Sequence, residues 1–183
     1  MIAIFSDTHS VRGHELEGEA FAAAREADRV IHAGDFTSVA ALEAFRGECG
    51  TLLAVHGNAD DPAVADRLPT ERVVEVPVGS DDSTDATDRT VRIAVTHRRD
   101  GGETGLAMFG RSRGADVVVF GHSHRPTVVE TEDVLLLNPG SHAQPRGNRP
   151  GFAVLEPRAD GDGLEGRVLG PDGTLLESFD VPR

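Results

Sequence analysis

The feature that most constrains this chain is a pattern that occurs five times: a short apolar run, rich in β-formers, that ends in Asp, Asn or His. Such runs are typical of buried strands, and strands that alternate with helices favour a parallel sheet. The carboxyl ends of parallel strands meet at one edge, where open α/β sheets hold their functional sites. The polar residues at the run ends are Asp7, His9, Asp35, Asn58, His97, His122 and His124.

The first run, residues 2–5, leads into Asp7-Thr8-His9. In an extended chain, residues two apart point to the same side, so the spacing predicts that Asp7 and His9 bind one ion together. Taken alone, the pair is also consistent with an Asp that caps a turn and a His that merely follows it. The recurrence of the pattern favours metal binding.

Hydrophobic periodicity predicts an α/β chain. Apolar residues recur at helical spacing over residues 15–28, 38–45 and 103–113. Strands are expected at residues 2–5, 29–33, 51–55, 72–78, 90–96 and 116–120. The acidic stretch 79–88 is expected to be a solvated hairpin loop. The shorter β segments are expected to form an antiparallel meander, and with it a second sheet beside the first, at residues 127–129, 134–137, 152–155, 166–169 and 174–179.

Length and charge limit the class of protein. A chain of 183 residues suits one domain, residues 1–183, with a substantial core. Its 31 acidic residues outnumber 18 basic ones, all of them Arg, and the net charge of −13 makes nucleic acid an unfavourable partner. An acidic surface without Lys is typical of a halophilic protein, in which salt screens the repulsion, although a solvated surface without functional meaning fits equally well.

Cysteine content and hydropathy indicate a compartment. Cys49 is the only cysteine, which excludes an intrachain disulfide and a thiolate metal cluster. No apolar run approaches membrane-spanning length, and residues 1–5 lead directly into the first motif without room for a cleavable signal. We therefore expect a soluble, cytoplasmic protein with no membrane partner.

The candidate ligands are carboxylates, imidazoles and one amide, without thiolate. This set favours Mn²⁺, Fe²⁺, Co²⁺, Ni²⁺ or Zn²⁺. Seven candidates are too many for one structural zinc ion and suit two ions that share a carboxylate. Asp35, isolated on its own strand end behind Gly34, is the natural shared residue. Two ions about 3.5–4 Å apart can hold a hydroxide between them and clamp the oxygens of a phosphate ester.

Five motifs, in their order along the chain, resemble the calcineurin-like metallophosphoesterase superfamily, in particular its small single-domain phosphodiesterases. They are Asp7-Thr8-His9, Gly34-Asp35, Gly57-Asn58-Ala59-Asp60, Thr96-His97 and Gly121-His122-Ser123-His124. A sixth, Asn138-Pro139-Gly140-Ser141, is similar to a late motif of that subgroup.

The resemblance implies a four-layer αββα fold with two mixed β-sheets and a dinuclear centre, with Mn²⁺ as the first expectation. By the family pattern, one ion is held by Asp7, His9, Asp35 and His124, and the other by Asp35, Asn58, His97 and His122. Asp35, Asn58 and His97 are the implied catalytic residues. The implied reaction is hydrolysis of a small phosphodiester or phosphate ester by a hydroxide that bridges the two metals.

Ala59 is a departure from the family pattern. Many relatives have at this position a His that protonates the leaving group, and general acid help is typically worth about 10²–10⁴-fold. We therefore expect phosphodiesters to be favoured over unactivated monoesters. His14 and His142 lie in loops that could border the site, and each is a candidate replacement acid, although an exposed loop histidine is the simpler interpretation.

Arg98 and Arg99 are a second departure, because the family pattern has Gly-His after the residue that corresponds to His97. Together with Asn58, their guanidinium groups are candidates for binding a substrate phosphate. Surface residues that balance nearby acidic groups are equally consistent. Asp60 is expected to orient a ligand histidine or a water molecule.

Two other functions compete with the enzyme. The superfamily includes the retromer subunit, a protein-binding scaffold with altered ligands, so a non-catalytic metal-binding or protein-interaction module is one alternative. A small nuclease is the other, and the charge disfavours it. A homodimer is expected from the resemblance alone.

Overall fold

The strands of this chain form two sheets in the computed structural model, which describes residues 1–78, 90–159 and 163–181. One sheet contains β1 (Ile2–Phe5), β2 (Arg29–His32), β3 (Leu52–Ala54), β9 (Phe152–Pro157), β10 (Leu164–Leu169) and β11 (Leu175–Val181). The other contains β4 (Glu71–Pro77), β5 (Thr90–Thr96), β6 (Val117–Val119), β7 (Thr127–Glu130) and β8 (Leu135–Asn138). The loop expected at residues 79–88 lies outside the described residues.

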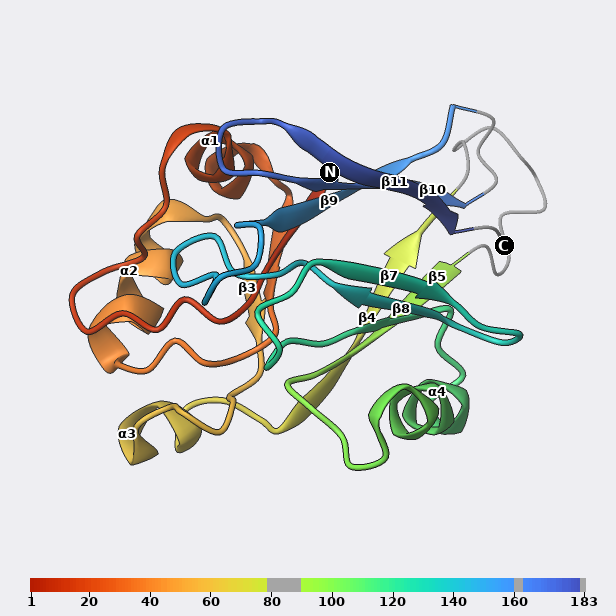
Figure 1. Cartoon of the computed structure of the whole chain (residues 1–183), viewed down its shortest axis with the longest axis horizontal. Helices are drawn as coiled ribbons and strands as arrows, with labels where there is room; N and C mark the ends of the chain where they lie inside the picture. Colours follow the sequence, from red (N-terminus) through yellow and green to blue (C-terminus); the bar gives the residue numbers. More distant parts are fainter. Residues whose placement is uncertain (79–89, 160–162, 182–183) are drawn as a thin grey trace.

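Both sheets are mixed. Their strand orders are β11-β10-β9-β1-β2-β3 and β4-β5-β6-β8-β7 (Figure 1). In the first sheet β1, β2 and β3 are parallel neighbours, and in the second β5, β6 and β8 are parallel neighbours. The five polar run ends follow β1, β2, β3, β5 and β6, so every one of them lies at the carboxyl end of a parallel strand.

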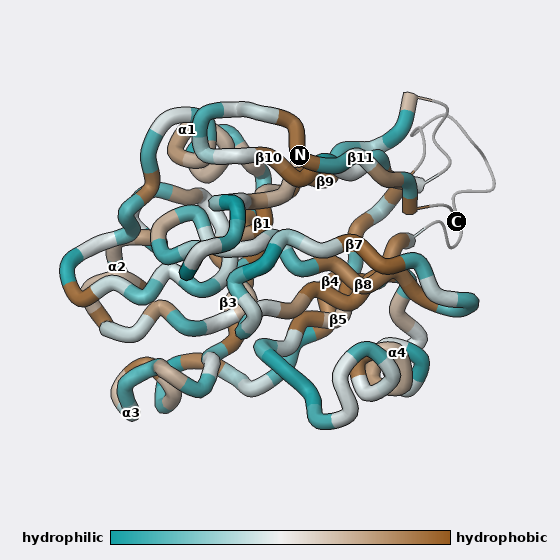
Figure 2. Tube along the Cα trace, in the orientation of Figure 1, coloured by the Kyte–Doolittle hydropathy of each residue, from teal (hydrophilic) through white to brown (hydrophobic). Residues whose placement is uncertain are grey.

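Side chains that alternate along the strands fill the layers. On β1, Ile2 and Ile4 lie in the core between the two sheets, whereas Ala3 and Phe5 lie in the core under the first helices. On β6, Val118 faces the last helix. Figure 2 shows hydrophobic stretches around β5 and β8, whereas β10 and β11, which also contribute to the inter-sheet core, alternate buried apolar with exposed residues. The four-layer αββα arrangement is therefore confirmed.

Four helices lie in the described residues: α1 (Gly18–Glu26), α2 (Val39–Glu48), α3 (Pro62–Ala65) and α4 (Gly102–Ser112). Helix α1 begins three residues later than periodicity predicts, because Glu15 has a left-handed backbone angle and Glu17, the N-cap, is extended. Helix α3, a single turn opened by its proline, was not predicted. None of these helices is long and apolar enough to cross a membrane.

The prediction that the C-terminal segments build the second sheet is wrong for the last three strands. β9 pairs antiparallel with β1, and β10 and β11 extend the same sheet. The physical reason is burial on both faces. Phe152 and Val154 pack under the helices while Ala153 and Leu155 pack between the sheets, so β9 needs an interior position beside β1. β7 and β8 do belong to the second sheet.

Two helical glycines predict opposite effects of the same substitution. In the buried face of α4, a Cβ at Gly110 would lie 2.7 Å from Val118 Cγ2 and 3.1 Å from Val134 Cγ2. We expect Gly110→Ala to lower the free energy of unfolding by about 1–3 kcal/mol, because overpacking outweighs the gain in helix propensity.

The matched control is Gly47→Ala in α2, where the new Cβ would meet no atom within 4 Å. It should raise the free energy of unfolding by about 0.5–1 kcal/mol, since alanine restricts the unfolded chain more than glycine does. Urea denaturation measures both variants. A Gly110→Ala protein as stable as wild type would contradict the packing of α4 against the second sheet.

Candidate metal centre

The loops that carry the predicted residues turn sharply as they leave the strands. The residues with left-handed backbone angles include Asp7 (φ 55°), His9 (φ 46°), Asp35 (φ 59°), His122 (φ 70°) and His124 (φ 56°). The expectation that Asp7 and His9 project from extended chain is therefore wrong, since β1 ends at Phe5. Such conformations cost about 1–3 kcal/mol each in residues other than glycine, and they cluster at functional sites.

Hydrogen bonds between the loops hold these turns in place. The N–H of Asp7 donates to the carbonyl of Gly34, and the N–H of His9 donates to the carbonyl of Asp35, both at 3.0 Å. The Ser141 hydroxyl donates to the carbonyl of Asp7 at 2.7 Å. The late motif thus supports the first one across 134 residues of chain.

Asp7 is fully buried beneath the loop that carries His122. Its carboxylate accepts the Ser6 hydroxyl at 2.7 Å and the N–H of His122 at 3.0 and 3.1 Å. Only glycine fits at position 121, because a Cβ there would lie 2.0 Å from Ser6 Oγ and 2.7 Å from Asp7 Oδ2. The contact with His122 also joins the carboxyl edges of the two sheets, since Asp7 follows β1 and His122 follows β6.

Asp35 is buried at the place where the two sets of histidines meet. Its Oδ1 accepts the N–H of Ala59 at 2.7 Å. Its Oδ2 lies 3.1 Å from His97 Nε2 and 3.4 Å from His9 Nε2. Burial alone raises the pKa of Asp35, but His97, the Ala59 N–H and His9 together outweigh it and bring the pKa to about 2. The carboxylate is therefore ionised and presents one oxygen to two histidines.

Three imidazoles are oriented through their Nδ1 atoms. Nδ1 of His97 lies 2.8 Å from the Ala33 carbonyl, and Nδ1 of His124 contacts the carbonyl of Gln144. A carbonyl can only accept, so Nδ1 carries the proton in both rings and Nε2 of the neutral imidazole offers a lone pair. Nδ1 of His9 lies 3.2 Å from the Thr37 hydroxyl.

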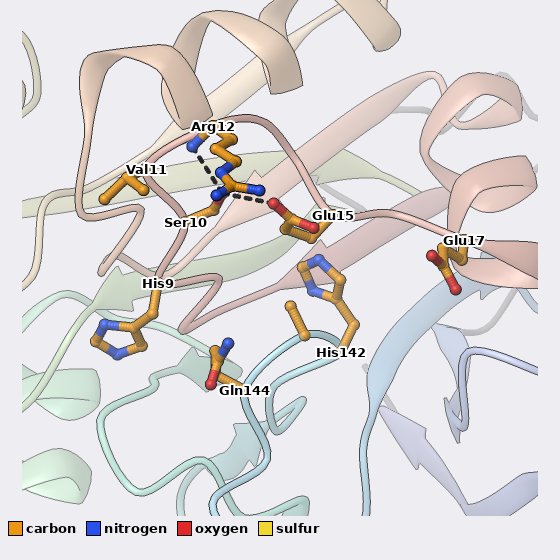
Figure 3. Close-up of a pocket in the computed structure, with 9 residues that line it drawn as sticks. His9, Ser10, Val11, Arg12, Glu15, Glu17, His142 and Gln144 are labelled. Carbon is orange, nitrogen blue, oxygen red and sulfur yellow. Dashed lines mark hydrogen bonds between the residues drawn. The ribbon is translucent and has the colours of Figure 1, made fainter.

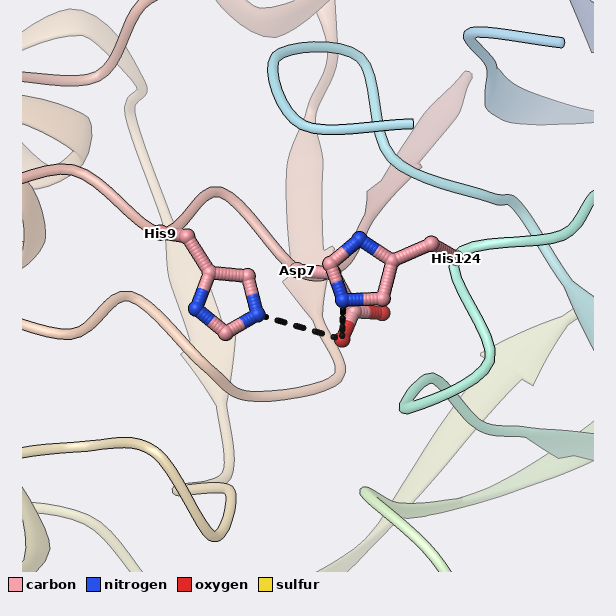
Figure 4. A group of neighbouring side chains, drawn as sticks. All are labelled: Asp7, His9 and His124. Atoms are coloured by element: carbon pink, nitrogen blue, oxygen red, sulfur yellow. Dashed lines mark ion pairs between the residues drawn. The ribbon is translucent and has the colours of Figure 1, made fainter. Parts of the chain in front are cut away.

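The three Nε2 atoms face the buried carboxylates. Asp7 Oδ1 lies 3.5 Å from His124 Nε2 and 3.8 Å from His9 Nε2 (Figure 4). His97 Nε2 is buried and has no hydrogen-bond partner of good geometry in the described structure, although Asp35 Oδ2 is close. Lone pairs that face carboxylate oxygens repel unless a proton or a metal cation lies between them, and Asp35 accordingly raises the pKa of His97 against the effect of burial. This donor set therefore fits divalent metal ions.

Two overlapping groups of side chains place their ligand atoms close enough together to bind a metal ion. In each group the atoms lie within 4.8 Å of one another: Asp7, His9 and His124 form the first, and Asp7, Asp35 and His97 form the second. Five of the seven predicted residues thus come together. The His122 ring lies 5.5 Å from the His97 ring, and the exposed Asn58 lines a cavity of about 210 Å³ with His97.

Arg98 and Arg99 lie on the same small cavity but differ in their surroundings. The guanidinium of Arg99 pairs with Glu71 and lies 4.2 Å from the centre of the Phe109 ring. Arg98 is exposed, and its charge helps burial to lower the pKa of His122. Of the two arginines, Arg98 is the one whose charge acts on the centre.

Asp60 has a different role from the expected one. Its carboxylate accepts the backbone N–H groups of Gly57, Thr37 and Asp35 at 2.8, 2.7 and 3.1 Å. It therefore fixes the backbones of two ligand-bearing loops and contacts neither a histidine nor a ligand carboxylate through these bonds. The expectation that His142 is an exposed loop residue is also wrong, because His142 is buried against Phe5 and burial lowers its pKa to about 4.

Sequence reasoning missed the groups that orient the ligands. Ser6 precedes Asp7, and a hydroxyl beside a buried Asp is a signal that could have been used. Thr37 sits two residues after Asp35 and gave no comparable signal. The carbonyls of Ala33 and Gln144 could not be singled out from the sequence, because every residue has a backbone carbonyl.

Metal binding should stabilise the folded protein. At a free Mn²⁺ concentration of 100 times the dissociation constant, we expect about 2.7 kcal/mol of added stability, seen as a rise in Tm. Asp35→Ala should lose most of this rise, because Asp35 Oδ2 faces both His9 and His97. The control is Arg111→Gln on α4, where Arg111 pairs with Asp133 at 3.2 Å, and this substitution should leave the rise intact. An equal rise in both variants would contradict the site.

The chain is similar in sequence to known phosphoesterases. The model of the calcineurin-like phosphoesterase superfamily domain matches residues 1–160. A probable metallophosphoesterase from Methanothermobacter thermautotrophicus is 32% identical over 190 residues, which cover 100% of this chain and 99% of that protein. A phosphodiesterase from Methanocaldococcus jannaschii is 28% identical over 139 residues, which cover 76% of this chain and 82% of that protein.

The fold is shared with solved structures. Wild-type Vps29 from Entamoeba histolytica, complexed with Zn²⁺, superposes with a TM-score of 0.74 at 20% identity, and the match covers 98% of each chain. At that identity the likeness concerns the fold alone. The family match over most of the chain, together with the relative that is alike over its full length, shows that this chain belongs to the calcineurin-like phosphoesterase superfamily.

Proposed function

We propose that this chain is a phosphodiesterase that uses two divalent metal ions, of which Mn²⁺ is the first candidate. One observation carries the proposal: a single oxygen, Asp35 Oδ2, faces both His9 Nε2 and His97 Nε2. This supports Asp35 as the ligand that both ions share. Asp7, His9 and His124 would complete one set, and Asn58, His97 and His122 the other.

The metal ions, when bound, supply positive charge for the phosphate oxygens and lower the pKa of a water molecule that becomes the nucleophile. The protein contributes orientation. Hydrogen bonds at Nδ1 fix the His97 and His124 rings, so their Nε2 lone pairs are aimed before binding. The buried Asp7 and Asp35 provide the negative charge that such ions need.

The surroundings of Ala59 support diesters over monoesters. Its N–H holds Asp35 Oδ1 at 2.7 Å, and its methyl group is exposed and has no proton to give a leaving alkoxide. In the proposed reaction Asn58 and Arg98 bind the non-bridging oxygens from the side of His97. Arg99 contributes less there, because Glu71 already pairs with its charge.

Hydrolysis of bis(p-nitrophenyl) phosphate in high salt with added Mn²⁺ tests the proposal. We expect turnover that EDTA abolishes. Asp35→Ala and His97→Ala should each lower kcat/KM by about 10³-fold or more, since one removes the shared ligand and the other a buried one. An Arg111→Gln control on α4, where Arg111 pairs with Asp133, should stay within about threefold of wild type, as expected of an exposed substitution away from the ligands and the small cavity.

The same assay separates the alternatives. A folded protein that binds Mn²⁺ but turns over no diester with Mn²⁺, Co²⁺, Ni²⁺, Fe²⁺ or Zn²⁺ would favour a non-catalytic scaffold. Faster cleavage of single-stranded oligonucleotides than of small diesters would favour a nuclease, against the net charge of −13.

Ala59→His should add the missing acid. The exposed position leaves room for an imidazole, and the backbone N–H that holds Asp35 is retained. We expect the rate with p-nitrophenyl phosphate or a less activated monoester to rise about 10–100-fold, the lower part of the range for general acid catalysis. Ala59→Gln is the matched control, similar in reach but without a titratable proton. Equal rates in the two variants would show that bulk or polarity, and not acid catalysis, is responsible.

A further inference from the structure

A second, larger cavity of about 470 Å³ adjoins the metal centre on the side of His9 (Figure 3). His9 forms part of its wall, and so does Gln144, whose carbonyl contacts His124 Nδ1. It shares no lining residue with the small cavity beside His97. Each cavity includes one of the two histidines that face Asp35 Oδ2. A phosphate bound by metal ions between these histidines would therefore have room for a substituent on both sides.

The wall of the larger cavity is charged and polar. Arg12 and Glu17 line it, and within the described residues their side chains have no hydrogen bond or ion pair. Glu15 accepts the Ser10 hydroxyl through Oε1 at 2.8 Å, which leaves Oε2 for another donor. Buried His142 donates to the His14 carbonyl through Nε2, so its Nδ1 is an acceptor without a partner in the described structure.

The cavity lacks the surfaces that a base or an acyl chain needs. The chain contains no Tyr and no Trp, and no Phe lines this cavity. Of the two imidazoles in its wall, His9 already stacks on His124 and His142 is buried. Stacking on an aromatic ring is the usual means of holding a nucleobase, and an acyl chain needs an apolar wall. Hydroxyl groups suit the wall better, because each can donate to a carboxylate and accept from a guanidinium.

We propose that this cavity binds one ester substituent of the diester, and that the substituent is a polyhydroxylated alcohol such as glycerol. The inference rests on the proposed function, because it assumes that metal ions at Asp35 bind the phosphate. Arg146 supports it: its Nη2 lies 3.5 Å from His9 Nε2, and its left-handed backbone (φ 49°) is the kind of conformation found at ligand sites. A guanidinium beside His9 can pair with the charge of the phosphate on the side where the polyhydroxylated substituent enters the larger cavity.

Three p-nitrophenyl diesters with the same leaving group test the inference. Their second substituents are methyl, 2,3-dihydroxypropyl and thymidine-5′. We expect kcat/KM to be about tenfold higher for the dihydroxypropyl diester than for the methyl diester, the gain of one or two well-placed hydrogen bonds, and higher than for the thymidine diester. In Arg12→Gln and in Glu17→Gln the ratio of dihydroxypropyl to methyl should fall towards one. Arg111→Gln, on the exposed side of α4 where Arg111 pairs with Asp133, should keep it.

Binding provides a readout that does not depend on turnover. Calorimetry with the Mn²⁺-loaded protein should give a dissociation constant for glycerol 3-phosphate about tenfold lower than for methyl phosphate, and Arg12→Gln should remove the difference. Equal kcat/KM for the three diesters, or a preference for thymidine, would overturn the inference while leaving the diesterase proposal intact. No hydrolysis of any diester would count against the proposed function, and the ratio of the two dissociation constants would then decide the role of the cavity alone.

Discussion

The burial of two carboxylates governs this structure. Asp7 and Asp35 have almost no solvent contact, and an ionised carboxylate without partners is very costly in such a place. Each is therefore surrounded by donors: Ser6 and the N–H of His122 for Asp7, and the N–H of Ala59 for Asp35. Backbone donors can come this close only where no Cβ intervenes, which explains the glycines at positions 57 and 121. The remaining negative charge is directed at the histidines, and a metal ion can compensate it.

The two sheets make this arrangement rigid. β1 and β6 are short, and all their residues are buried, so the loops that follow them start from a fixed core. The turns after both strands adopt left-handed angles, which are unfavourable by themselves. They persist because hydrogen bonds link loops from both sheets, such as that from Ser141 to the Asp7 carbonyl. The interlocking bonds therefore compensate the cost of the turns that place the carboxylates.

The sequence predicted what local pattern and chemistry determine. Strand ends and ligand types follow from periodicity and from the chemistry of Asp and His, whereas the family resemblance supplied the layer order and the expected pairing of ligands to ions. The sequence did not predict the position of β9, because the place of a strand buried on both faces depends on partners far away in the chain. It also missed the role of Asp60, whose carboxylate binds backbone N–H groups of two loops, since such groups are the same at every residue.

The overall charge of the protein affects how it can bind a phosphate ester. A protein with a net charge of −13 repels a phosphate diester at long range, so local cations and screening by salt must compensate near the centre. The arginines around it are distributed unevenly. Arg98 lies beside the small cavity and Arg12 lines the large one, while the charge of Arg99 is taken up by Glu71. In the proposed function this leaves Arg98 on one side of the diester, and Arg12 together with Arg146 on the other. Charge alone does not favour a diester, because a monoester dianion is attracted more strongly by the same arginines. In the proposed function the preference for diesters comes instead from space: a monoester would fill only one of the two cavities, which is a reason independent of Ala59.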